Sequence, residues 1–189
     1  EITYILLPDE LGVLIPDAVE VLAKAAEGYA AMVLGPGLTQ EKEAVAFVHR
    51  MFGMERALKR GRLGFQLEPE TAEAPPPAFS WPPLIVDADG LNAIAQAREW
   101  AARLPGPAIL TPHPGEMARL TGLEKAAIEA DRLGIARQFA QAWGHVVVLK
   151  GAFTVVAAPD GQALVMPFAN PAMATAGTGD VLAGAIAGL

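Results

Sequence analysis

The sequence predicts an α/β fold of three layers, in which helices cover both faces of a mostly parallel central sheet. Three observations support it. Short apolar runs alternate along the chain with segments of helical periodicity. One clear hairpin signal, Pro159-Asp160-Gly161, lies late in the chain between two apolar runs. The 189 residues are 52% hydrophobic and 19% charged, which is enough apolar material for one sizeable core.

The expected elements follow from these runs. We expect strands at residues 2–7, 31–34, 83–86, 108–110 and 145–149, and hairpin strands at 153–157 and 163–166. We expect helices at residues 16–27, 39–60, 89–103, 114–120 and 124–143, and a last helix that begins near Asp180. Thr39 is a candidate cap for the second helix. The acidic, proline-rich residues 61–83 predict an exposed loop within a single domain.

Composition excludes several classes of function. A net charge of −7 argues against general nucleic-acid binding, although it permits binding of nucleotides. The chain has no cysteine, which excludes disulfides and cysteine metal sites and fits a reducing, cytoplasmic location. The apolar residues 181–189 are too few to cross a membrane, and no secretory signal leads the chain. Because the chain lacks an initiator Met and stops within an expected helix, we expect it to be incomplete at both ends.

The sequence Gly177-Thr178-Gly179-Asp180 comes just before an apolar, helix-like run. Glycines let backbone N–H groups converge, and a helix start adds partial positive charge, so this segment could bind a phosphate. A carboxylate beside a phosphate suggests chemistry as well as binding, because it could take a proton from a hydroxyl that attacks phosphorus. The alternative is a glycine turn with an aspartate as helix cap.

Further polar motifs follow expected strands. They are Gly35-Pro36-Gly37, Asp87-Ala88-Asp89, Thr111-Pro112-His113-Pro114-Gly115-Glu116 and Lys150-Gly151. Parallel α/β sheets bind ligands at the carboxyl ends of their strands, so we expect these motifs to converge. Each has a simpler interpretation: a tight turn at residues 35–37, a helix cap at Asp89, a structural His113, and a surface charge at Lys150.

Four blocks in order carry a family resemblance. They are residues 87–92 (Asp-Ala-Asp-Gly-Leu-Asn), residues 111–116, residues 150–154 (Lys-Gly-Ala-Phe-Thr) and residues 170–184, which include the Gly-Thr-Gly-Asp sequence. Together they closely resemble the ADP- or ATP-dependent NAD(P)H-hydrate dehydratases, which are metabolite repair enzymes of the ribokinase-like superfamily. The similarity runs from about residue 35 to residue 189. The family's earlier glycine-rich region and later helices are not recognised in this chain.

The resemblance implies a hydro-lyase with a ribokinase-like fold over residues 1–189. Its substrate would be the S-epimer of NADH-hydrate or NADPH-hydrate, and ADP or ATP would drive loss of the added water. The implied cofactor is Mg²⁺, held through phosphates and water rather than by direct protein ligands. Implied partners are these small molecules and a fused or separate epimerase. We also expect a homo-oligomer that binds neither nucleic acid nor membrane.

The resemblance also implies roles for individual residues. Asp180 would be the catalytic base. The nucleotide and its phosphates would be bound by Lys150, Gly151, Ala152, Phe153, Thr154, Gly177, Thr178 and Gly179. The hydrated dinucleotide would be bound by Gly35, Gly37, Asp87, Asn92, His113, Glu116, Asn170 and Asp180.

Two other functions stay open at this point. One is a vitamin-precursor kinase of the same superfamily that acts on a thiazole or pyridine alcohol, because the Gly-Thr-Gly-Asp sequence alone does not distinguish it. The other is a nucleotide-binding module without catalytic activity. The residue blocks at 113–116 and 150–154 favour the dehydratase over the kinase, and the intact Asp180 counts against the silent module.

Overall fold

The computed structural model describes residues 2–54 and 79–189. In this part of the chain six strands form one sheet, in the order β3-β4-β5-β6-β7-β8. They are β3 (Met32–Leu34), β4 (Leu84–Val86), β5 (Ile109–Leu110), β6 (Val146–Leu149), β7 (Val155–Ala157) and β8 (Ala163–Val165). The first four run parallel, and β7 and β8 are antiparallel to their neighbours. The predicted, mostly parallel sheet with a late hairpin is confirmed.

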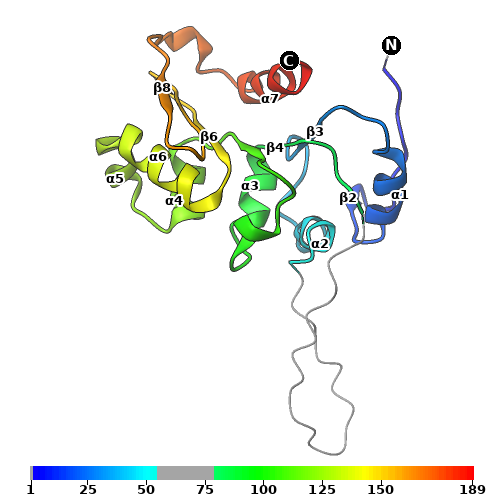
Figure 1. Ribbon diagram of the computed structural model, residues 1–189. Coiled ribbons are helices and arrows are strands. Elements are labelled where there is room, and N and C mark those ends of the chain that lie inside the picture. Colours follow the sequence, from blue (N-terminus) through cyan, green and yellow to red (C-terminus); the bar gives the residue numbers. More distant parts are fainter. Residues whose placement is uncertain (1, 55–78) are drawn as a thin grey trace, which may run out of the picture.

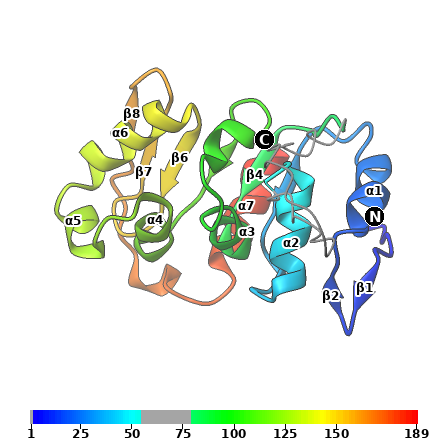
Figure 2. The same ribbon diagram turned by 90° about the horizontal axis from the view of Figure 1, so that it is seen from below.

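Helices lie on both faces of the sheet. The elements outside it are β1 (Asp9–Glu10), β2 (Val13–Leu14), α1 (Ala18–Ala25), α2 (Lys42–Met51), α3 (Ala88–Ile94), η1 (Trp100–Arg103), α4 (Pro114–Thr121), α5 (Lys125–Ala130), α6 (Arg132–Trp143), η2 (Pro171–Met173) and α7 (Thr178–Gly188). Figure 1 shows α2, α3 and α4 on one side of the sheet and α7 on the other. In Figure 2, seen from below, α7 lies behind α2 and α3.

The strand order explains why α2, α3 and α4 lie on the same face of the sheet. Each parallel connection steps to the next strand in the same direction, from β3 to β6. Because such crossovers are right-handed, connections that keep stepping the same way place their helices on the same face. The second face therefore needs an element from elsewhere in the chain. It receives α7, which contacts β3 and β4.

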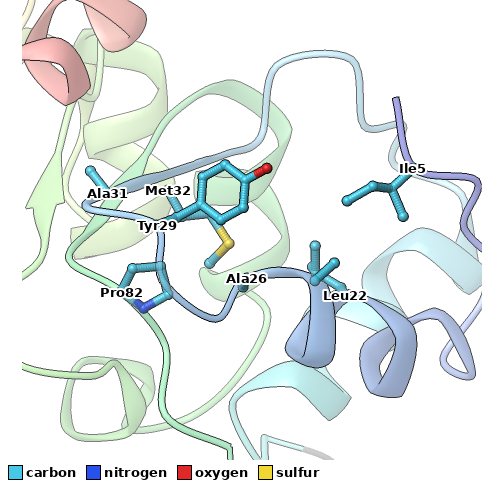
Figure 3. Close-up of a pocket in the computed structure, with 8 residues that line it drawn as sticks. Ile5, Leu22, Ala26, Tyr29, Ala31, Met32 and Pro82 are labelled. Carbon is cyan, nitrogen blue, oxygen red and sulfur yellow. The ribbon is translucent and has the colours of Figure 1, made fainter. Parts of the chain in front are cut away.

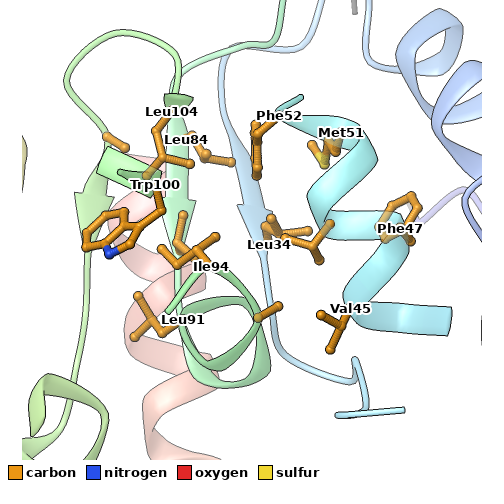
Figure 4. Close-up of a cluster of buried hydrophobic side chains, with 14 of the residues drawn as sticks. Leu34, Val45, Phe47, Met51, Phe52, Leu84, Leu91, Ile94, Trp100 and Leu104 are labelled. Carbon is orange, nitrogen blue, oxygen red and sulfur yellow. The ribbon is translucent and has the colours of Figure 1, made fainter. Parts of the chain in front are cut away.

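The core forms where the first helix layer meets the sheet. β4 is buried along its whole length, and α2 and α3 pack apolar side chains against it and its neighbours. Figure 4 shows Leu91 and Ile94 of α3 near Trp100, and Phe47 of α2 on the side of its helix away from the strands; all four side chains are buried. A second buried cluster joins α6 to β6 and β7. These contacts hold the strand ends, and the loops that follow them, in fixed positions.

The strand expected at residues 2–7 is wrong. This segment has no regular structure, and the side chains of Ile2, Tyr4 and Leu6 are exposed. A strand needs a neighbour for its backbone hydrogen bonds, and this segment has no paired strand in the described residues. Instead β1 and β2 form a small hairpin that the sequence reasoning missed, in which Asp9 Oδ1 accepts a hydrogen bond of 2.8 Å from the Gly12 N–H.

Two predicted helices, the second and the third, end earlier than expected. The second ends at Met51 rather than at residue 60, because Gly53 has a φ of 64° that no helix continues. Its N-cap is Glu41 and not Thr39, so the predicted cap is wrong. The helix expected at 89–103 is shorter, because α3 ends at Ile94 and only the short η1 follows, after Glu99 with its left-handed φ of 53°. The loop expected at residues 61–83 lies largely outside the described residues.

The helix expected at residues 124–143 is two helices. α5 ends and α6 begins at Asp131, which has a φ of −139°. Asp131 Oδ1 accepts a hydrogen bond of 2.8 Å from the Gly134 N–H and so caps α6. The apolar periodicity continues through this break, which is why pattern alone predicted one helix.

An apolar pocket of about 170 Å³ lies between α1 and the start of β3 (Figure 3). Leu22, Ala26, Tyr29, Met32 and Pro82 are among the residues that line it. It is at the amino end of β3, so it lies away from the strand ends that carry the polar motifs. Among residues 2–54 and 79–189, no helix has the length and hydrophobicity needed to cross a membrane.

Candidate functional site

The predicted polar motifs follow the carboxyl ends of neighbouring parallel strands. Gly35 follows β3, Asp87 follows β4, Thr111 follows β5 and Lys150 follows β6. Backbone hydrogen bonds link these ends, from Asp87 N to Leu34 O (3.0 Å), from Thr111 N to Val86 O (3.1 Å) and from Lys150 N to Pro112 O (2.8 Å). The expected convergence of these segments is therefore present in the structure.

A buried ion-pair cluster lies at this edge of the sheet. The Lys150 ammonium donates to Asp87 Oδ1, and Lys150 Nζ is 3.8 Å from Glu116 Oε2. The side chain of Asp87 is 1% exposed and that of Lys150 is 18% exposed. Two carboxylates thus share one cation, which retains a limited opening to solvent. Lys150 is not the surface charge of the simpler interpretation.

His113 and Glu116 form a capping box at the start of α4. His113 Nδ1 accepts hydrogen bonds from the backbone N–H groups of Gly115 (2.9 Å) and Glu116 (3.2 Å). In return Glu116 Oε2 accepts a hydrogen bond of 2.8 Å from the His113 N–H, and Glu116 Oε1 is 3.3 Å from His113 Nε2. Pro112 and Pro114 restrict the backbone on either side. The exposed imidazole is therefore held in one orientation.

Burial shifts the acid–base behaviour of both residues. It raises the pKa of the Glu116 carboxyl, although the hydrogen bond from the His113 backbone and the charge of Lys150 act in the opposite direction. Burial also lowers the pKa of His113, and the positive charge of Lys150 lowers that pKa further. A neutral His113 that accepts at Nδ1 carries its proton on Nε2, the nitrogen that faces Glu116 Oε1.

The segment before α7 brings the phosphate-binding candidate to this cluster. Gly177 is the N-cap of α7 with a φ of 85°, and the Thr178 hydroxyl donates to Thr175 O at 2.8 Å. A Cβ placed on Gly179 would lie 3.4 Å from Lys150 Nζ and 3.5 Å from Asp87 Oδ2. The first turn of α7 thus lies directly beside the Lys150–Asp87 ion pair. Its N–H groups have no partner within the helix, as at any helix start.

Asp180 lies in the first turn of α7 and is exposed. The N-cap position belongs to Gly177, so the alternative in which Asp180 only caps the helix is wrong. Asp89 likewise lies inside α3, whose N-cap is Asp87, and its predicted role as a cap is also wrong. Asp180 is therefore a carboxylate on a fixed helical turn, next to the glycine that contacts the ion pair.

Residues 150–154 form a tight turn between β6 and β7. Gly151 has a φ of 144° and the exposed Phe153 a φ of 55°, and the Thr154 hydroxyl donates to Gly151 O at 2.9 Å. Arg132 of α6 lies beneath this turn and donates to the carbonyls of Leu149 (2.8 Å) and Lys150 (3.2 Å). Sequence reasoning missed Arg132, because nothing in the α6 sequence distinguishes it from a surface arginine.

The remaining candidates have other surroundings. A Cβ on Gly35 would lie 1.7 Å from Asp87 O, so Gly35 lets two strand ends approach, whereas Gly37 faces open space. Asn92 donates to Asp89 Oδ1 and accepts from Arg119, each at 3.1 Å, and so bonds along α3 and to α4. The exposed Asn170 accepts from Ala172 N at 3.0 Å and caps η2. The structure therefore groups Asp87, His113, Glu116, Lys150 and Gly179, and it bonds Asn92 and Asn170 elsewhere.

Comparison with known proteins points to the NAD(P)H-hydrate dehydratases. A family model described as NAD(P)H-hydrate dehydratase matches residues 76–189. The chain is 41% identical over its whole length to a bifunctional NAD(P)H-hydrate repair enzyme of Moorella thermoacetica, of which it covers 31%. It is 34% identical over 88% of its length to the ADP-dependent (S)-NAD(P)H-hydrate dehydratase of Bacillus subtilis, of which it covers 49%. The chain thus spans half or less of the length of these relatives.

Solved structures agree in fold. The ADP/ATP-dependent NAD(P)H-hydrate dehydratase of Bacillus subtilis, co-crystallised with ATP and Mg²⁺, superposes with a TM-score of 0.61 at 32% identity. That match covers 91% of this chain and 52% of the other. A ribokinase-like superfamily protein of Enterococcus faecalis superposes with a TM-score of 0.65 at 24% identity, which supports the fold alone. By the family match and the sequence identity, the chain belongs to the NAD(P)H-hydrate dehydratase family.

Proposed function

We propose that the full-length protein dehydrates the S-epimer of NADH-hydrate or NADPH-hydrate with the aid of ADP or ATP, and so restores the reduced cofactor. Family membership supports the reaction class. The observation that carries the proposal is local: the first turn of α7 lies beside the buried Lys150–Asp87 pair, with Asp180 exposed on the same turn. Backbone N–H groups at a helix start, a cation and a carboxylate are the groups that phosphoryl transfer to an alcohol requires.

The chemistry follows from the poor leaving ability of hydroxide. The ring hydroxyl oxygen would attack the terminal phosphorus of the nucleotide, Asp180 would take the hydroxyl proton, and AMP or ADP would leave. The C–O bond of the resulting phosphoester would then break with loss of phosphate. A proton lost from the adjacent ring carbon would restore the double bond. The net result is loss of one water from the ring at the expense of one phosphoanhydride bond.

The other residues would bind and orient the two substrates. Backbone N–H groups of residues 177–179 would stabilise charge on the migrating phosphoryl group. Residues 150–154 would hold the adenylate, and the fixed exposed imidazole of His113 would contact the hydrated dinucleotide. The open space at Gly37 would let the same ligand approach the backbone. Asp87, Asn92, Glu116 and Asn170 would complete or support this pocket.

Magnesium fits this site as an ion carried mainly by the nucleotide. In the described ranges, no group of three or more His, Asp or Glu side chains could hold a metal ion by itself. Asp87, the most buried carboxylate, is already paired with Lys150. The ligands of Mg²⁺ would therefore be phosphate oxygens and water. When bound, the ion would neutralise charge on the phosphates during transfer.

The substitution Asp180→Asn tests the assigned base in the full-length protein. Loss of a general base lowers turnover by about 10²–10⁴-fold, so turnover of the hydrate should fall by that order. Binding of ADP, followed by calorimetry, should persist because the N–H groups of the α7 turn are unchanged. Asp160→Asn, in the exposed β7–β8 turn, is the matched control and should retain normal turnover. Normal turnover by Asp180→Asn would show that the base is another group.

Two expectations about partners stay predictions. The first is a homo-oligomer in solution. The second is cooperation with an epimerase that converts the other hydrate epimer into the substrate. The relative from Moorella thermoacetica is named a bifunctional repair enzyme, which supports such a pairing in this family. A cytoplasmic location is likewise a prediction from the absence of cysteine.

A further inference from the structure

Asp87 is too deeply buried to act mainly as a substrate ligand. Its side chain is 1% exposed, and its Oδ1 accepts from the Lys150 ammonium. Burying an unpaired carboxylate is costly, so this aspartate needs the lysine, and the lysine in turn is confined by it. The two residues are 63 positions apart in the sequence and meet only because β4 and β6 end at the same edge.

Both the backbone and the ammonium group of Lys150 are held in place. Its backbone N–H donates to Pro112 O at 2.8 Å, and its carbonyl accepts from Arg132 at 3.2 Å. Its ammonium faces Asp87 and, at 3.8 Å, Glu116. A free lysine side chain loses considerable rotamer entropy when it is ordered on a ligand, whereas this one is ordered in advance.

The ammonium keeps a donor for a ligand. It has three N–H donors, and its hydrogen bond to Asp87 Oδ1 uses one of them, while Glu116 Oε2 lies 3.8 Å away as an ion-pair partner. Lys150 is 18% exposed rather than fully enclosed, and a Cβ on Gly179 would lie 3.4 Å from Nζ. A ligand oxygen that reaches the N–H groups of the α7 turn would therefore also reach a remaining N–H donor of Lys150.

Gly179 is needed for access rather than for backbone conformation. Its φ lies outside the left-handed region, and a Cβ there would meet its neighbours at ordinary contact distance. An alanine would fit without strain, but its methyl group would stand between the ammonium and the ligand space. Gly177 is different, since its φ of 85° requires glycine while a Cβ would face open space.

We propose that Asp87 is a positioning residue that holds the Lys150 ammonium beside Gly179, where the ammonium donates to a phosphate oxygen of the nucleotide. Asp87 acts through Lys150 and does not touch the ligand. This inference rests on the proposed function, because it assigns a nucleotide phosphate to the α7 turn. It adds that loss of Asp87 weakens binding of the nucleotide rather than binding of the hydrated dinucleotide.

A double-mutant cycle on the full-length protein tests the inference. ADP affinity is measured by calorimetry for the wild type, Asp87→Asn, Lys150→Met and the double variant. Lys150→Met should weaken ADP binding by about ten- to a hundredfold, the usual effect of losing a charged hydrogen bond. Asp87→Asn should weaken it less, by about three- to tenfold. In the Lys150→Met background Asp87→Asn should have almost no further effect.

Control variants distinguish a loss of Lys150 positioning from a loss of folding. The double variant removes both charges of the Lys150–Asp87 pair, and Glu116 keeps its hydrogen bond from the His113 N–H, so thermal unfolding should find the variant folded. Lys24→Met, at an exposed position of α1, should leave ADP affinity unchanged. Gly179→Ala should unfold at a temperature close to that of the wild type and still bind ADP more weakly. In steady-state kinetics Asp87→Asn should raise KM for ADP more than KM for the hydrate.

The outcomes distinguish the two proposals. Additive effects of Asp87→Asn and Lys150→Met on ADP affinity would overturn the positioning role while leaving the proposed function intact. So would full ADP affinity in Gly179→Ala. Absence of ADP and ATP binding by the wild type would instead contradict the proposed function.

Discussion

Gly177 lies at the N-cap of α7 and Gly184 inside the same helix, and single substitutions distinguish their roles. Gly177 adopts a φ of 85°, which places the α7 cap in the left-handed region, whereas Gly184 lies inside the same helix with open space around it. A side chain at a left-handed position costs about 1–2 kcal/mol. Alanine in place of glycine inside a helix gains about 0.5–1 kcal/mol.

Gly177→Ala and Gly184→Ala should therefore change stability in opposite directions. The first should lower the free energy of unfolding by about 1–2 kcal/mol, and the second should raise it by about 0.5–1 kcal/mol. Urea unfolding of the two variants beside the wild type measures both. Equal effects of the same sign would mean that the backbone of the α7 cap differs from that described.

The residues of the site were predictable to different degrees. The motifs after β3, β4, β5 and β6 were identifiable because a polar residue directly after a buried strand has a fixed location in a parallel sheet. The pairing of Asp87 with Lys150 was not, since it joins residues far apart in the chain. Arg132 gave no signal, because its role depends on the carbonyls that α6 happens to face.

At the scale of elements, errors occurred where a single residue breaks a continuing pattern. Apolar periodicity runs on beyond Ile94 and through Asp131, yet α3 ends at Ile94 and the φ of −139° at Asp131 separates α5 from α6. At the amino end, an apolar run was read as a strand although no strand pairs with it in the described residues. Element type was predictable from periodicity, whereas boundaries depended on local backbone choices and on tertiary partners.

The His145 side chain links η1 to the residue that precedes β5. It is 3% exposed, its Nδ1 accepts from Ala108 N at 3.1 Å, and its Nε2 lies 2.9 Å from Ala101 O. Trp100 stacks beside its ring. Burial lowers the pKa of His145, although the bond to Ala101 acts in the opposite direction. The unfolded chain therefore takes up this proton more readily than the folded one, and stability falls as pH drops below the ordinary value of 6.5.

His145→Phe should isolate this contribution. Each buried backbone group left without a partner costs about 1–3 kcal/mol, so the variant should be clearly less stable at neutral pH. Its deficit should shrink between pH 7 and pH 5.5, because only the wild type has a histidine to protonate there. Urea unfolding at several pH values measures the difference. A deficit that stays constant or grows on acidification would contradict the assigned neutral histidine.

At the scale of the whole molecule, the sheet and its two helix layers were predictable because strand–helix alternation constrains topology strongly. The chain spans half or less of the relatives compared above, and it carries the strand-end cluster and the α7 turn together. Side chains such as Val181 on α7 are exposed. We propose the activity for the full-length protein, in which these residues would supply the phosphoryl-transfer groups.

The most direct test follows the reaction of the full-length protein with the S-epimer of NADH-hydrate, ADP and Mg²⁺. The account predicts recovery of the reduced-nicotinamide absorbance, with one AMP and one phosphate released for each NADH formed. Recovery should depend on the nucleotide and should be lost in Asp180→Asn. Nucleotide binding without any recovery of NADH, or a stable phosphorylated alcohol as the product, would contradict it.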